Sequence, residues 1–140
     1  MFSTVAVGTD GSSTAAQAVH AAAEIARRFD AKVVLLSAFR ESGEGPSDPS
    51  GDEEQWAFNP VARLREMLSR QEDELRSQGL DCSTLLEEGN PADVLVRLAE
   101  SSGADLLVIG NKGIRRRVLG SVPNSVTHHA PCAVLVVKTT

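Results

Sequence analysis

The sequence has no tyrosine, one tryptophan and only two cysteines among its 140 residues. Cys82 and Cys132 show no CxxC or Cys/His spacing that could gather a zinc ion, so we expect small buried side chains and no metal site. No apolar run approaches the roughly 20 residues that a membrane helix needs. The opening residues also lack the features of a signal peptide. We therefore expect a cytoplasmic protein that does not associate with membranes.

An excess of positive charge is also missing, because the formal net charge is −5. This charge repels nucleic acid and anionic membranes at long range, so we expect no nucleic-acid partner, and any site for a polyanion must be local. With 140 residues the chain fits a single domain, residues 1–140, which buries roughly two thirds of the surface of its unfolded chain.

Short β-branched runs alternate with longer helical patterns along the chain. The predicted strands are residues 4–9, 32–39, 81–88, 104–110 and 132–138. The predicted helices between them are residues 13–29, 60–78, 91–102 and 121–130. This order predicts an α/β fold with a doubly wound parallel sheet and helices on both faces. In such sheets a ligand lies at the carboxyl ends of the strands.

The segment from 40 to 59 is rich in Gly, Pro, Ser and acidic residues and is long for a connection without secondary structure. Two interpretations stay open: a lid over a neighbouring surface, or a disordered segment.

Candidate binding residues stand where the predicted strands end. Asp10 follows the first strand and could accept hydrogen bonds from ribose hydroxyls, while Gly110 and Gly113 follow the fourth and would expose backbone N–H groups. Gly120 and Ser121 begin the last helix, whose N-terminus favours a phosphate. The segment between these glycines is basic, with Lys112, Arg115, Arg116 and Arg117. A solvated glycine turn is the alternative, but the combination predicts a phosphate-bearing ligand.

The chain resembles the universal stress protein family over essentially its whole length. The resemblance lies in "VAVGTDGS", "GNPADVLVRLAESSGADLLVIGNKG" and "LGSVPNSVTHHAPCAVLVV". It implies an adenine nucleotide alpha hydrolase-like fold with a five-stranded parallel sheet of order 3-2-1-4-5. One subgroup of the family binds ATP or a related adenine nucleotide through G-x2-G-x9-G-[ST].

Carried over to this chain, the family's site implies ten cofactor-binding residues. Gly8 and Asp10 would flank the adenine and ribose, and Ala38 would meet the adenine edge. Ile109, Gly110, Lys112 and Gly113 would line the ribose and phosphates, and Gly120, Ser121 and Val122 would close the phosphate end. Here only six residues, 114–119, separate Gly113 from Gly120, whereas the family's loop has nine. ATP, with Mg²⁺, is the first expectation, and AMP or cyclic AMP is the alternative.

The resemblance implies a nucleotide-binding stress-response regulator with no catalytic residues and at most slow ATP hydrolysis. His20, His128 and His129 fall on predicted helices, and neither a Gly-x-Ser-x-Gly elbow nor a Walker A sequence is present. A ligand-free dimeric scaffold is one alternative, although relatives of that kind lack the glycine motif. A phosphoacceptor domain using Asp10 ranks lower, because the first strand offers no second carboxylate for magnesium.

Two further expectations follow from the implied strand order. Cys82 and Cys132 would lie at opposite edges of the sheet, roughly 19 Å apart, whereas a disulfide tolerates Cα separations of up to about 7 Å. The apolar last strand, CAVLVVK, would be an edge with unpaired backbone groups. Family members pair this strand across a two-fold axis, so we expect a homodimer.

Overall fold

The computed structural model describes residues 1–40, 60–111 and 119–138. Its five-stranded parallel sheet has the order β3-β2-β1-β4-β5, which confirms the predicted topology. The strands are β1 (Thr4–Gly8), β2 (Lys32–Phe39), β3 (Cys82–Glu88), β4 (Leu106–Asn111) and β5 (Ala133–Lys138). The helices are α1 (Ser13–Phe29), α3 (Pro60–Ser77), α4 (Pro91–Ser101) and α5 (Ser121–His129). Apart from Arg40, the segment from 40 to 59 lies outside the described residues, so both interpretations of it stay predictions.

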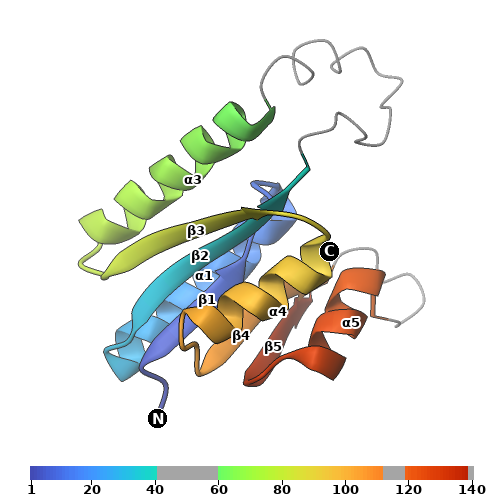
Figure 1. The fold of residues 1–140 in the computed structure, drawn as a ribbon. Helices are drawn as coiled ribbons and strands as arrows, with labels where there is room; N and C mark the ends of the chain where they lie inside the picture. Colours follow the sequence, from blue (N-terminus) through green and yellow to red (C-terminus); the bar gives the residue numbers. More distant parts are fainter. Residues whose placement is uncertain (41–59, 112–118, 139–140) are drawn as a thin grey trace.

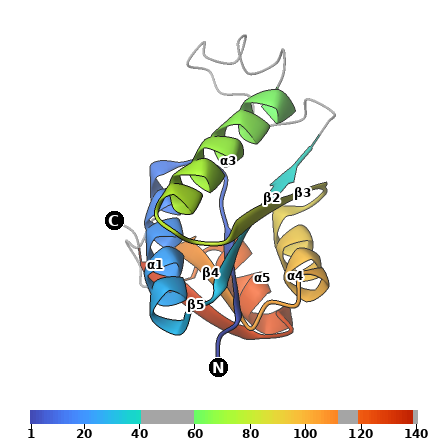
Figure 2. The ribbon, with the colours of Figure 1, turned by 90° about the vertical axis from the view of Figure 1, so that its left-hand side faces the viewer.

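Helices cover both faces of the sheet (Figures 1 and 2). The side chains of α1 and α3 pack with Val5, Val7 and Leu35 on one face. Those of α4 and α5 pack with Ala6, Leu36 and neighbouring residues of β2 and β4 on the other. The alternation along each strand, in which successive side chains enter opposite clusters, is what a sheet buried on both faces requires.

Alanine lets α1 lie close to the sheet. Its buried residues are Ala15, Ala18, Val19, Ala22, Ala23 and Ala26. Ser12, directly before the helix, caps it by accepting a hydrogen bond from the Ala15 N–H at 3.1 Å. Phe29 continues the helical spacing of these apolar residues, but it is 49% exposed and packs edge-on against Phe2 with ring centroids 5.3 Å apart. The apolar stripe of α1 therefore extends one turn beyond its buried surface.

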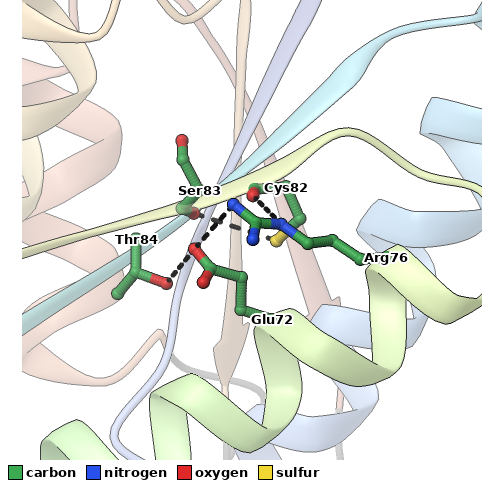
Figure 3. Close-up of polar contacts among 5 residues, drawn as sticks. All are labelled: Glu72, Arg76, Cys82, Ser83 and Thr84. Carbon is green, nitrogen blue, oxygen red and sulfur yellow. Dashed lines mark hydrogen bonds and ion pairs between the residues drawn. The ribbon is translucent and has the colours of Figure 1, made fainter.

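Polar side chains of α3 bind that helix to the edge strand β3 (Figure 3). The Arg76 Nε donates to the Cys82 carbonyl oxygen at 3.0 Å, and the Thr84 hydroxyl donates to Glu72 at 3.2 Å. Arg76 and Glu72 also form an ion pair at 3.8 Å. The Cys82 side chain beneath them is fully buried. These bonds hold α3 over β3, at the edge of the sheet opposite β5.

Both cysteines are free, as predicted, with Cys82 on β3 and Cys132 just before β5 at the opposite edge. Burial, with the Glu72 carboxylate as a second cause, raises the pKa of the Cys82 thiol to about 12. Burial also raises the pKa of the partly exposed Cys132 thiol, and the Asp105 carboxylate adds to this.

We expect a maleimide at pH 8 to label Cys132 first and to leave Cys82 unmodified until the protein unfolds, because access and thiolate character together control reactivity. Mass spectrometry of the labelled protein would count and locate the adducts. The Cys132→Ala variant is the matched control and should take up almost no label in native buffer. Equal labelling rates at the two cysteines would show that β3 opens readily beneath α3.

Among the described residues, no helix combines the length and the apolar character needed to cross a membrane.

Candidate functional site

The carboxyl ends of β1, β2 and β4 border a cavity of about 420 Å³. From this end β1 continues into α1 on one face of the sheet, whereas the next helix after β4 is α5 on the other face. The strand order reverses between β1 and β4, which is where open α/β sheets bind their ligands. The cavity thus occupies the position that the fold predicts for a site.

The structure brings together the described residues that the sequence singled out. Those that line the cavity are Gly8, Asp10, Ala38, Ile109, Gly110, Gly120, Ser121 and Val122. Lys112 and Gly113, together with Arg115, Arg116 and Arg117, lie outside the described residues.

Sequence reasoning missed other residues that line the same cavity. They are Thr9, Ser12, Thr14, Ala15, Ser37, Pro91, Leu95, Asn111 and Pro123. Four of them, Thr9, Ser37, Asn111 and Pro123, are direct neighbours in sequence of predicted residues, and this proximity was a usable signal. Pro91 and Leu95 carried no such signal, because they reach the cavity only through the packing of α4 against the sheet.

The turn after β1 holds Asp10 at the cavity. The Thr9 N–H donates to the Leu36 carbonyl at 2.9 Å, which continues the contact between β1 and β2 one residue past the strand. Gly11 has φ +83°, a conformation that favours glycine, and its N–H donates to the Thr9 hydroxyl at 3.1 Å. The Asp10 Oδ1 accepts from the Ser12 N–H at 2.9 Å. Since a carboxylate has about four acceptor positions, Asp10 retains capacity for ligand hydroxyls.

The N-terminus of α5 forms another part of the cavity wall. Gly120 is the N-cap residue, and the cap has no side-chain hydrogen bond. The Gly120 N–H donates to the Asn111 Oδ1 at 3.0 Å, and the Asn124 N–H donates to the Gly120 carbonyl at 2.9 Å. Ser121 and Val122 carry the N–H groups of the first turn that have no acceptor within a helix, and Pro123 has none. With no acidic residue in this turn, the wall favours an anion.

The cavity also borders β2, which extends beyond the end of its neighbour β1. The register between β1 and β2 ends at Gly8 and Leu36, whereas β2 continues to Phe39. Ser37 and Ala38 in this extension line the cavity. Ser37 is 1% exposed, and its hydroxyl has no hydrogen-bond partner among the described residues. The backbone N–H and C=O groups of this extension border the part of the cavity that β2 forms.

A second hollow, of about 400 Å³, lies between α1 and α3. Its lining includes Ala23, Arg27, Gln71 and Gln78, and every described lining residue belongs to α1 or α3 or follows α3 directly. No strand end contributes to it. The cavity at the strand ends is therefore the better candidate, although the two volumes are similar.

Comparison with known proteins decides the family, because the model of the universal stress protein family matches residues 1–138. The chain belongs to the universal stress protein family. It is 39% identical over 148 residues to universal stress protein Rv1636 of Mycobacterium tuberculosis, covering 99% of this chain and 98% of the relative. It is 34% identical over 151 residues to universal stress protein MJ0531 of Methanocaldococcus jannaschii, covering 99% of this chain and 83% of the relative.

A solved universal stress protein in complex with cAMP is similar in both fold and sequence. The TM-score is 0.74 and the sequence identity is 32%, with 99% of this chain and 98% of that chain covered.

In this universal stress protein the histidines lie away from the cavity. His20 is exposed on α1, and His128 and His129 are exposed in the last turn of α5. Of the described residues that line the cavity, only Asp10 carries a titratable side chain. The Asp10 carboxylate can accept hydrogen bonds from a polar ligand in this cavity.

Proposed function

We propose that this universal stress protein binds an adenine nucleotide in the cavity at the strand ends and acts as a stress-response regulator. The observation that carries the proposal is the convergence of Asp10, the β2 extension and the α5 N-terminus on one cavity. The complex of the 32% identical relative with cAMP gives the class of ligand. The volume of about 420 Å³ lies in the range of small-molecule sites.

In this proposal, different residues of the cavity contact the adenine, the ribose and the phosphate. Ala38 lies beside the adenine edge, where the backbone of the β2 extension is without β1 as a neighbour. Asp10 accepts hydrogen bonds from the ribose hydroxyls, and Gly8 leaves space because it has no side chain. The Ser121 and Val122 N–H groups donate to a phosphate. We assign Ile109, Gly110, Lys112, Gly113 and Gly120 to the ribose and phosphate end.

The number of phosphates is the part of the proposal that the short glycine loop affects. Because six residues instead of nine separate Gly113 from Gly120, we expect fewer contacts to β- and γ-phosphates than in the family's longer loop. Magnesium would accompany ATP or ADP by bridging their phosphates, and it has no such role with AMP or cyclic AMP. We therefore propose that one phosphate supplies most of the binding.

Calorimetric titration with adenosine, AMP, cyclic AMP and Mg·ATP tests this, with GMP as the control for the base. AMP or cyclic AMP should bind about tenfold more tightly than adenosine, because hydrogen bonds to a charged phosphate are strong. ATP that binds at least about tenfold more tightly than AMP would show that further phosphates are engaged. No binding of any adenine nucleotide at about 1 mM, by folded protein, would contradict the proposal.

We also propose a homodimer that forms through β5. This strand is at one end of the sheet, and its Leu135 is an exposed large hydrophobic side chain at 37%. An apolar edge strand favours pairing with another strand, and a second copy of the chain supplies one.

Replacing Leu135 by Glu should shift the protein to monomers at micromolar concentration, because a charge at a strand-pairing surface must be desolvated. Light scattering with size exclusion would measure the mass. Ser83→Glu adds the same charge at an exposed position of β3 and should leave the dimer intact. A wild-type monomer, or equal effects of the two variants, would contradict pairing through β5.

A further inference from the structure

Asn111 joins the end of β4 to the start of α5. It is the last residue of β4 and is only 5% exposed. Its Oδ1 accepts a hydrogen bond from the Gly120 N–H at 3.0 Å, nine positions further along the chain. A Cβ at Gly120 would lie 3.3 Å from this same oxygen, which is a tight approach. The position of the Asn111 amide oxygen therefore favours a residue without a side chain at position 120.

This bond controls which donors the helix presents. Gly120 is the N-cap residue, so its N–H belongs to the group at a helix start that has no acceptor in the helix. Asn111 accepts the hydrogen bond from that N–H. The next N–H groups along the chain, those of Ser121 and Val122, are the ones that the helix presents to a ligand. The same bond fixes the first turn of α5 relative to the end of β4, where Ile109 and Gly110 also line the cavity.

We propose that Asn111 is a positioning residue for the phosphate of the bound nucleotide, acting through Gly120 and the first turn of α5. This inference rests on the proposed function. It concerns one part of the ligand only: the adenine and ribose contact β2 and the turn after β1, whereas the phosphate depends on the direction in which the α5 N–H groups point. A residue that only stabilised the fold would affect the whole ligand.

Comparing adenosine with AMP separates these two roles. In Asn111→Ala the Gly120 N–H loses its acceptor and the first turn of α5 is no longer held against β4. AMP affinity should fall about tenfold, since oriented donors to a charged group are strong, and adenosine affinity should change less than about threefold. Asn124→Ala is the control on α5, because Asn124 is exposed and does not line the cavity.

Asn111→Asp provides a second variant with a different signature. Its carboxylate can still accept from the Gly120 N–H, but its negative charge opposes a phosphate nearby. Hydrogen exchange of the Gly120 amide should remain slow in Asn111→Asp and become faster in Asn111→Ala. Both variants should bind adenosine normally and AMP weakly.

The outcomes distinguish the inference from the proposed function. If wild-type protein binds AMP and Asn111→Ala binds it equally well, or loses AMP and adenosine by the same factor, the positioning role is wrong and the nucleotide site stands. Unchanged exchange of the Gly120 amide in Asn111→Ala would also overturn it. If wild-type protein binds neither ligand, the proposed function fails and this inference fails with it.

Discussion

Replacing Ser121 by Glu is expected to weaken AMP binding at least about tenfold while the melting temperature stays equal or rises. Ser121 is the exposed first residue of α5 and lines the cavity. Two like charges about 4 Å apart repel by about 4 kcal/mol at an effective dielectric constant near 20, and solvent screening lowers this value at an exposed position. The same carboxylate is favourable to the helix, because the first turn of α5 has no acidic residue.

Ser121→Gln is the matched control, because it has the size of glutamate without the charge. It should retain most of the AMP affinity, and both variants should bind adenosine as the wild-type protein does. Calorimetry for binding and thermal unfolding for stability provide the two measurements. If Ser121→Glu bound AMP as tightly as Ser121→Gln, the phosphate would lie away from the α5 N-terminus.

Replacing Leu35 by Ala should lower the free energy of unfolding by about 2–5 kcal/mol. Leu35 is fully buried on β2 and belongs to the cluster that α1 and α3 form with the sheet. Its truncation leaves a cavity in a close-packed interior, where the surrounding structure relaxes only partly.

Urea unfolding at one fixed protomer concentration would measure this loss, since dimer formation makes stability concentration-dependent. Leu35→Met conserves the volume and should lose less than about 1.5 kcal/mol. A loss below about 1 kcal/mol in Leu35→Ala would mean that the two helices do not pack closely on this face of the sheet.

The fold was predictable because local signals agreed along the whole chain. The run at 32–39 has the period and length of a buried strand, and the structure gives it the same bounds. Ser12 before an alanine-rich helix, and Gly79 with φ +88° after α3, fixed the ends of those helices. The exposure of Phe29 was not predictable, because the helical period shows which side a residue occupies but not where the partner surface stops.

From the residues alone, the site was predictable where glycines and a carboxylate stand at strand ends or at the start of the last helix. Asp10, Gly110 and Gly120 follow this pattern and line the cavity, whereas the resemblance was needed to indicate Gly8, Ala38, Ile109 and Val122. Asn111 did not stand out, because its role depends on a contact with a residue nine positions away. Leu95 is one apolar residue among several on α4, and only the packing of that helix shows that it borders the cavity.

The most direct test of the central claim is a titration of ¹⁵N-labelled protein with AMP, followed by NMR spectroscopy of the assigned backbone amides. Saturable shifts should concentrate at Gly8, Ala38, Gly110, Ser121 and Val122, while Gln71 and Gln78 in the hollow between α1 and α3 remain unchanged. Shifts confined to that hollow, or no saturable shifts anywhere, would contradict a nucleotide site at the carboxyl ends of the strands.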